Sequence, residues 1–167
     1  MITTPDFTTT LLVERAPKEV FQAINNVRGW WSEEIEGSTD KLDSEFTYRY
    51  KDVHQCKIKL IEFVPHKKVV WVVLDNYFNF TQDRHEWKNT RIVFEISMNA
   101  DKTELRFTHQ GLVPEYECYD ICKDGWNNYI HNSLHDLITI GKGKPNPKSG
   151  GFNEWLIEQH GIDKNNK

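Results

Sequence analysis

His109 is the side chain of this sequence best suited to acid–base chemistry. It stands on the inward register of a strand-like run, Thr103–Gly111, and an unperturbed imidazole titrates near neutral pH, as a general acid or base requires. No carboxylate or nucleophile stands at a fixed spacing from it, as it would in a catalytic pair. We therefore predict a hydrogen-bonded structural histidine, with general acid–base catalysis as the alternative, and assign no catalytic residue.

Two pairs of residues have the one-turn helical spacing that can bring two ligands to one metal ion. His131 and His135 form one pair, but Asn132 stands where the hydrolytic motif His-Glu-x-x-His has its glutamate. Cys118 and Cys122 form the other, and no second pair shares their face of the helix. We predict solvated histidines, buried thiols that behave as small apolar side chains, and no metal site. Cys56 is interpreted in the same way.

Composition and charge exclude several classes of function. A chain of 167 residues is one domain's worth, and a net charge of −4 offers no basic face to nucleic acid. The longest apolar run, Val69–Leu74, is too short to span a bilayer, and the N-terminus has no secretion signal pattern. Three cysteines do not make a disulfide framework. We expect a cytoplasmic protein that binds neither nucleic acid nor membrane; with no phosphate loop or nucleotide fingerprint, no cofactor is expected.

The elements that must position these side chains follow from hydrophobic periodicity. Alternation of apolar and polar residues predicts strands at 7–13, 44–50, 56–60, 69–74, 91–98 and 103–111. Pro17 begins a short helix, the stretch 33–43 is a surface loop, and 76–89 extends a hairpin. Sequential strands joined by short turns favour an antiparallel meander.

A long helix is predicted from Glu115 to Ile140, roughly 40 Å at about 1.5 Å per residue. At about 100° per residue, its inner arc is Tyr119, Cys122, Trp126, Tyr129, Ile130, Ser133, Leu137 and Ile140. The two histidines described above fall on the opposite, polar arc. The helix therefore has one buried face that can cross a whole sheet.

An unusual aromatic content, 13% with six Trp, indicates either a bulky core or an aromatic-walled pocket. The inward faces of the strands and of the long helix converge on one set of residues. These predicted ligand-binding residues are Phe46, Tyr48, Trp71, Phe94, Phe107, His109, Tyr119, Cys122, Trp126 and Tyr129, together with Trp30 and Trp31. Core filling by the same side chains is the alternative; for the two adjacent tryptophans, anchoring of the following loop competes equally with capping one end of a cavity.

The chain resembles the START-like (SRPBCC) superfamily and, within it, the family of activator of heat-shock protein 90 ATPase homologues. The resemblance covers roughly residues 7 to 145. It is carried by Ala16–Ile24, Trp30-Trp31, Glu86–Ile96, Thr103–Leu112, Gly125-Trp126, Ser133-Leu134 and Gly141-Lys-Gly143. No one of these segments is diagnostic, but their ordered set is specific to the family.

The resemblance implies an α+β helix-grip fold, a curved antiparallel sheet wrapped around a long C-terminal helix, with a cavity between them that superfamily members use for apolar molecules. It supplies no catalytic motif. Eukaryotic activators carry a separate N-terminal chaperone-binding domain, whereas here the first strand is expected almost at Met1, so we expect no such domain.

We predict a START-like helix-grip domain at 1–145 and a C-terminal extension at 146–167. The extension contains a short amphipathic segment around Phe152, Trp155 and Leu156, which packs back on the domain or, alternatively, on a partner subunit. The predicted function is binding of a small hydrophobic or aromatic ligand. The alternatives are a chaperone-interacting module and a polyketide cyclase-like enzyme, and the partners considered are a chaperone or a second copy of the chain.

Overall fold

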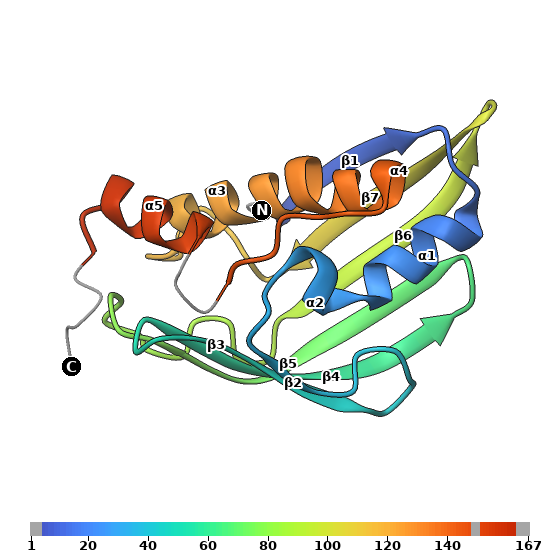
Figure 1. The fold of residues 1–167 in the computed structure, drawn as a ribbon. Helices are drawn as coiled ribbons and strands as arrows, with labels where there is room; N and C mark the ends of the chain where they lie inside the picture. The colour runs from blue at the N-terminus through green and yellow to red at the C-terminus, as the bar shows by residue number, and fades with distance from the viewer. Residues whose placement is uncertain (1–4, 148–150, 163–167) are drawn as a thin grey trace.

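The computed structural model describes residues 5–147 and 151–162, and its centre is a curved antiparallel sheet (Figure 1). The strands pair in the order β1-β7-β6-β5-β4-β3-β2. Their bounds are β1 Phe7–Val13, β2 Ile35–Gly37, β3 Glu45–Tyr50, β4 His54–Val64, β5 Lys68–Phe78, β6 Arg91–Asn99 and β7 Lys102–Gln110. The linker residues 148–150 and the polar end 163–167 of the predicted extension lie outside the described residues.

Strands β2 to β7 form the predicted meander. Strand β1 does not pair with β2 but lies at the other edge of the sheet, beside β7. Phe7 pairs with His109 and Val13 with Thr103, so β1 forms the sheet edge next to β7. The stretch expected to be only a loop, 33–43, also supplies a strand, because β2 pairs with β3 from Ile35 opposite Tyr48 to Gly37 opposite Phe46.

The long helix lies across the concave face of the sheet (Figure 1), and the predicted α+β helix-grip fold is confirmed. It consists of α3 (Tyr119–Asn128), a π-helical segment (Tyr129–Leu134) and α4 (His135–Ile140). A π-helical turn contains one more residue than an α-helical turn, so the buried face shifts after it. Leu134 and Ile138 are buried there, whereas the predicted inward residue Ile140 is 73% exposed.

Two shorter helices fill one half of the space between the sheet and the long helix. Helix α1 (Pro17–Asn25) begins where Glu19 Oε2 accepts a hydrogen bond of 2.9 Å from the Ala16 amide, which satisfies a donor that the first turn leaves free. Helix α2 (Val27–Trp30) follows it. Both lie on the concave side of the sheet in Figure 1.

A return segment, residues 141–147, leads the chain from α4 back along the molecule. Gly141 ends α4 with a left-handed φ of 78°, a conformation that glycine adopts without strain. At Gly143 a Cβ would lie 2.3 Å from the carbonyl oxygen of Gly29, so only glycine fits this close approach. The Asn146 amide then donates to the Trp31 carbonyl at 2.9 Å, which fixes the direction in which the chain continues.

Helix α5 (Phe152–Gln159) follows and packs against α3. Its Asn153, Leu156 and Ile157 are buried, whereas Trp155 is 49% exposed. The amphipathic segment therefore lies on this chain rather than projecting from it. We keep the boundary between domain and extension at residue 145 as a proposal.

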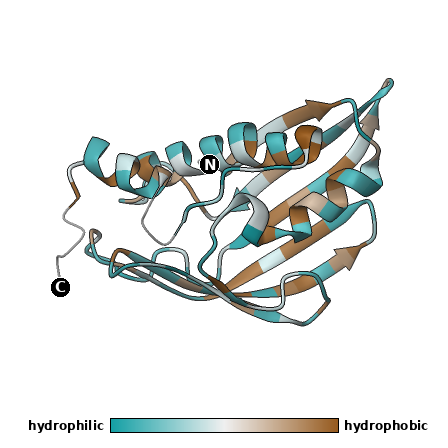
Figure 2. Cartoon of the chain, viewed as in Figure 1, coloured by the Kyte–Doolittle hydropathy of each residue, from teal (hydrophilic) through white to brown (hydrophobic). Residues whose placement is uncertain are grey.

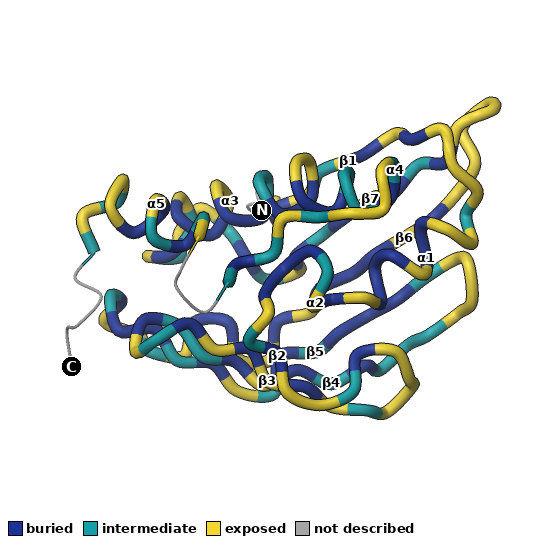
Figure 3. The backbone as a smooth tube through the Cα atoms, in the orientation of Figure 1, coloured by how far each residue is buried: buried dark blue, intermediate teal, exposed yellow. Residues whose placement is uncertain are grey.

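The hydrophobic core lies between the sheet and the helices. Hydrophobic residues gather along the strands beneath α1 (Figure 2). The central strands are buried, whereas the tip of the hairpin between β6 and β7 is exposed (Figure 3). Trp30, Trp31 and Trp71 form a stack in this core with interplanar angles of 20° or less. No helix in the described ranges has the length and apolar composition to cross a membrane.

Candidate ligand-binding cavity

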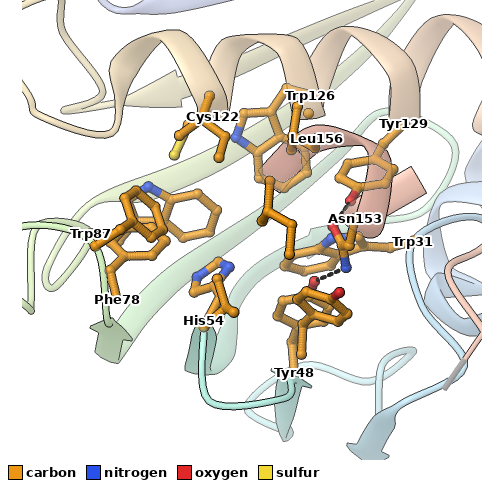
Figure 4. Close-up of a pocket in the computed structure, with 16 residues that line it drawn as sticks. Trp31, Tyr48, His54, Phe78, Trp87, Cys122, Trp126, Tyr129, Asn153 and Leu156 are labelled. Carbon is orange, nitrogen blue, oxygen red and sulfur yellow. Dashed lines mark hydrogen bonds between the residues drawn. The ribbon is translucent and has the colours of Figure 1, made fainter. Parts of the chain in front are cut away.

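A cavity of about 60 Å³ lies between α3, α5 and the inner face of the sheet. Aromatic rings make up most of its wall (Figure 4). The residues that line it are Trp31, Tyr48, Tyr50, Val53, His54, Phe78, Phe80, Trp87, Ile121, Cys122, Gly125, Trp126, Tyr129, Asn153, Leu156 and Ile157. A concave, largely apolar space with a few polar groups is the usual form of a small-molecule site.

Strands β3, β4 and β5 supply the sheet side of this cavity. Period-two alternation places His54 on the same face as the buried Cys56 of β4. In β5 a bulge changes the register, because Lys57 pairs with Asp75 whereas the next residue, Ile58, pairs with Val73. The extra residue shifts the inward positions of β5 by one. Beyond the bulge the even-numbered residues therefore face inward, among them the buried Phe78.

The rings surround the space from several sides. Trp31 stacks on Tyr48 with centroids 4.3 Å apart, and Trp87 stacks on Trp126 at 5.7 Å. In Figure 4, Trp87 lies on one side of the cavity and Trp31 and Tyr48 on the other, with His54 between them at the sheet. Flat aromatic faces on opposite sides suit a flat apolar molecule.

His109 lies behind this wall, where both of its ring nitrogens are engaged. Trp126 Nε1 donates to Nδ1 at 3.1 Å, so Nε2 carries the ring hydrogen and donates to Thr90 Oγ1 at 2.8 Å. Thr90 in turn donates to the Trp87 carbonyl. Burial lowers the pKa of His109 to about 3, which keeps the ring neutral. The geometry matches the predicted hydrogen-bonded structural histidine.

His54 is the imidazole that borders the cavity itself. Its Nε2 lies 2.9 Å from Asn76 Oδ1, and its ring packs edge-on against Tyr48 and Trp87. Burial lowers the pKa of His54 to about 3, although the hydrogen bond that its Nε2 donates to Asn76 Oδ1 opposes this. The wall therefore carries a neutral heteroaromatic ring at this point and not a cation.

Two tyrosine hydroxyls and two asparagines form the polar corner of the cavity. Asn153 Nδ2 donates to the Tyr48 hydroxyl at 2.9 Å, and the Tyr129 hydroxyl donates to Asn153 Oδ1 at 2.6 Å (Figure 4). Asn146 Nδ2 donates to the Tyr129 oxygen at 2.8 Å. Burial raises the pKa of Tyr48 and of Tyr129 above the ordinary range, so both side chains remain neutral hydroxyls.

The structure divides the predicted ligand-binding residues into three groups. Those that line the cavity are Trp31, Tyr48, Cys122, Trp126 and Tyr129. Those that lie in the core outside its wall, each at most 1% exposed, are Trp30, Phe46, Trp71, Phe94, Phe107 and His109. Tyr119 is half-buried at the first residue of α3, also outside the wall.

Two different neighbours separate the core group from the cavity: Trp126 lies in front of Phe107 and His109, and the segment of α2 covers the strands that carry Trp71 and Phe94. Trp30 shows this most directly, since its ring stacks on Trp71 at 6.3 Å and contacts Phe94 edge-on at 6.1 Å. Its Nε1 donates to the Ile24 carbonyl at 3.0 Å. Of the two adjacent tryptophans, therefore, Trp30 anchors the loop and Trp31 borders the cavity.

Several wall residues are not among those predicted from the sequence. His54 carried a usable signal, because it continues the inward alternation of Cys56, Ile58 and Leu60. Phe78 has no such signal in the sequence, because the bulge in β5 breaks the alternation before it. The other wall residues missed are Tyr50, Val53, Phe80, Trp87, Ile121, Gly125, Asn153, Leu156 and Ile157.

In the part of the chain that the structure describes, neither the His131–His135 pair nor the Cys118–Cys122 pair has a third metal ligand beside it. His131 Nε2 lies 2.6 Å from Thr9 Oγ1, and His135 pairs with Asp136 at 3.3 Å. Cys118 and Cys122 are both free and buried. Within residues 5–147 and 151–162, no cluster of three or more His, Cys, Asp or Glu side chains is arranged to hold a metal ion.

Comparison with known proteins identifies the family. The family model described as "Activator of Hsp90 ATPase homolog 1-like protein" matches residues 15–139. The chain belongs to this family. The matched residues of this family member include α1, most of the sheet and nearly all of the long helix, whereas α5 lies beyond them. No curated protein sequence matches the chain.

Solved structures of similar proteins share the fold at low sequence identity. The Aha1 dimer from Colwellia psychrerythraea has a TM-score of 0.67 at 22% identity, covering 83% of this chain and 99% of that one. Protein MLL2253 from Mesorhizobium loti has a TM-score of 0.61 at 15% identity, covering 79% and 96%. CalU16 from Micromonospora echinospora has a TM-score of 0.56 at 12% identity, covering 78% and 73%.

Proposed function

We propose that this protein binds a small, uncharged apolar or aromatic molecule in the cavity between α3, α5 and the sheet. The observation that carries the proposal is the wall itself, in which stacked rings line a space that the core packing leaves unfilled. Among the residues that the structure describes, no Lys or Arg lines this space, and burying an unpaired charge is costly. The wall therefore favours a neutral ligand over an anionic one.

The present volume of the cavity sets a condition on binding. A cavity of about 150 Å³ is the size that accepts benzene, whereas this one encloses about 60 Å³. An aromatic ligand therefore requires the cavity to widen. We propose that it widens at α5, because this short separate helix carries part of the wall.

The experiment is a titration with N-phenyl-1-naphthylamine, an uncharged probe that fluoresces in apolar surroundings. We expect saturable binding to the wild type and a loss of about tenfold or more in affinity for Cys122→Phe, which places a phenyl ring in the cavity beside Trp87. Lys123→Phe adds the same ring at the next, exposed position of α3 and should bind normally. Equal binding by both variants would rule out this cavity.

Two alternatives remain as proposals for the same chain. The family's description favours a chaperone-interacting module, for which stimulation of heat-shock protein 90 ATPase activity is the direct assay. A polyketide cyclase-like enzyme would use His54 as the imidazole at the cavity wall, and turnover sensitive to His54→Phe would support it. The dimer seen for the Colwellia relative supports a homodimer, and three free thiols support a cytoplasmic location.

A further inference from the structure

Helix α5 occupies the polar corner of the cavity with its own side chains. Asn153 is 6% exposed and Leu156 is 7% exposed, and both line the space. Leu156 lies against α3 where Gly125 has no side chain, since a Cβ there would be 3.6 Å from Leu156 Cδ2. The family match ends at residue 139, so α5 is an addition to the matched part of the fold.

One backbone donor determines the direction of every hydrogen bond in this corner. The Asn153 amide N–H donates to Asn146 Oδ1 at 3.0 Å, so Asn146 Nδ2 is the donor to the Tyr129 oxygen. The Tyr129 hydrogen is then available to Asn153 Oδ1, and Asn153 Nδ2 must donate to Tyr48. The carboxamide of Asn153 is thus held as a planar polar group between two hydroxyls.

We propose that α5 is a built-in occupant of the binding site and that the ligand displaces it, placing a carbonyl oxygen where the Asn153 carboxamide now lies. This inference rests on the proposed function of the cavity. When Asn153 leaves, the Tyr129 hydroxyl loses its acceptor, and a buried donor without an acceptor is costly. A carbonyl restores that acceptor, and a flat apolar body fills the space that Leu156 leaves. The ligand class is therefore an uncharged aromatic ketone or a similar carbonyl compound.

The attachment of α5 is compatible with its displacement. It is a helix of 8 residues, a length that is not stable by itself in water. Besides the buried corner, it is held by the buried side chains of Leu156 and Ile157. Glu154 also contacts Tyr50 and Lys51 at the end of β3, and a hydrogen bond of 3.0 Å joins His160 to Asp124. The Lys51–Glu154 ion pair is partly exposed, and a pair of this kind contributes little to stability. Two apolar side chains and the buried corner therefore hold α5, and it can detach while the sheet and the long helix stay folded.

The test uses the full chain and an uncharged aromatic ketone, 6-propionyl-2-dimethylaminonaphthalene, as the probe. At saturating probe we expect faster hydrogen exchange of the α5 amides 153–159, with unchanged exchange in α1. Asn153→Ala, which removes the competing carboxamide, should raise the apparent affinity about tenfold. Gln159→Ala, at an exposed position of the same helix, should leave it unchanged.

The carbonyl contact is tested separately with Tyr129→Phe. We expect the ketone probe to lose about three- to tenfold in affinity relative to N-phenyl-1-naphthylamine, which has no carbonyl, because one hydrogen bond is lost. Any effect of the substitution on α5 is common to both probes and cancels in this ratio. Tyr119→Phe, half-buried on the same helix, should leave the ratio unchanged.

The outcomes separate the two proposals. Binding to the wild type with slower exchange in α5, or weaker binding to Asn153→Ala, would overturn the displacement and leave the cavity as the binding site. An unchanged probe ratio in Tyr129→Phe would overturn the carbonyl assignment. If neither probe binds the wild type or Asn153→Ala, the proposed function fails and the inference fails with it.

Discussion

Replacing His109 by glutamine tests the hydrogen-bond chain behind the cavity wall. Glutamine keeps one acceptor for Trp126 Nε1 and one donor for Thr90 Oγ1, the two partners that the imidazole has now. It cannot bind a proton in the relevant pH range. The variant therefore differs from the wild type chiefly in the pH dependence of its stability.

The magnitude follows from the pKa of the folded and unfolded states. Burial, and more weakly the nearby His54, lowers the pKa of His109 from 6.5 to about 3. The unfolded chain takes up a proton below pH 6.5 and the folded protein does not until about pH 3. The stability contributed by neutral His109 is therefore complete above the unfolded pKa and is lost as the pH falls through this window. Between pH 7.5 and 4.5 the loss is about 2.6 kcal/mol, from about 1.36 kcal/mol per pH unit.

Urea unfolding of both proteins at several pH values between 7.5 and 4.5 measures this difference. Carboxylates and His54 titrate in both proteins, so their contributions cancel in the comparison. We expect the free energy of unfolding of the wild type to fall by about 2.6 kcal/mol more than that of His109→Gln. Parallel pH profiles would show that His109 is protonated in the folded state, and the assigned hydrogen-bond chain would then be wrong.

The remaining predictions concern contacts that position the cavity, each measured by urea unfolding at pH 7.5. Gly143→Ala should lower the free energy of unfolding by about 1–3 kcal/mol, because its Cβ would lie 2.3 Å from the Gly29 carbonyl oxygen; the exposed Lys142→Ala should change it by less than about 0.5 kcal/mol, and equal effects would contradict the close approach. Glu86→Ala should lower the free energy of unfolding by about 1–3 kcal/mol, since two backbone amides at the start of α3 lose their acceptor. An unchanged free energy of unfolding would mean that water replaces the carboxylate. Ser133→Ala should also lower the free energy of unfolding by about 1–3 kcal/mol, because its hydroxyl donates to the Trp30 carbonyl and accepts from the Lys144 amide of the return segment. Unchanged stability would show that this link is dispensable.

Most of the architecture could be predicted because it rests on local periodicity. The alternation of Phe7–Val13 and the register of Leu105, Phe107 and His109 both appear in the structure as expected. Their pairing with each other could not be read from either strand, because a period of two says which face is buried and not which strand is the neighbour.

The position of the cavity was less predictable than the fold. Deviations from ideal periods decide it, namely the bulge before Phe78 in β5 and the π-helical segment Tyr129–Leu134, and neither has a clear sequence signal. Trp30 stacks on Trp71 in the core. A high aromatic content alone does not show whether such rings fill the core or line an open pocket. The contribution of Asn153 depends on the path of the chain after α4, which no periodicity encodes.

The pairing of the first strand with the last has a consequence for biosynthesis. β1 is made before β7, and its pairing partners in β7 lie 90 residues (Val13 and Thr103) to 102 residues (Phe7 and His109) later in the chain. At about 5–20 residues per second on the ribosome, β1 waits roughly 5 to 20 s before it can pair. During that time its backbone donors and acceptors are open to other nascent chains. The threonines of β1, at positions 8, 9 and 10, keep the waiting segment polar, which limits co-translational aggregation.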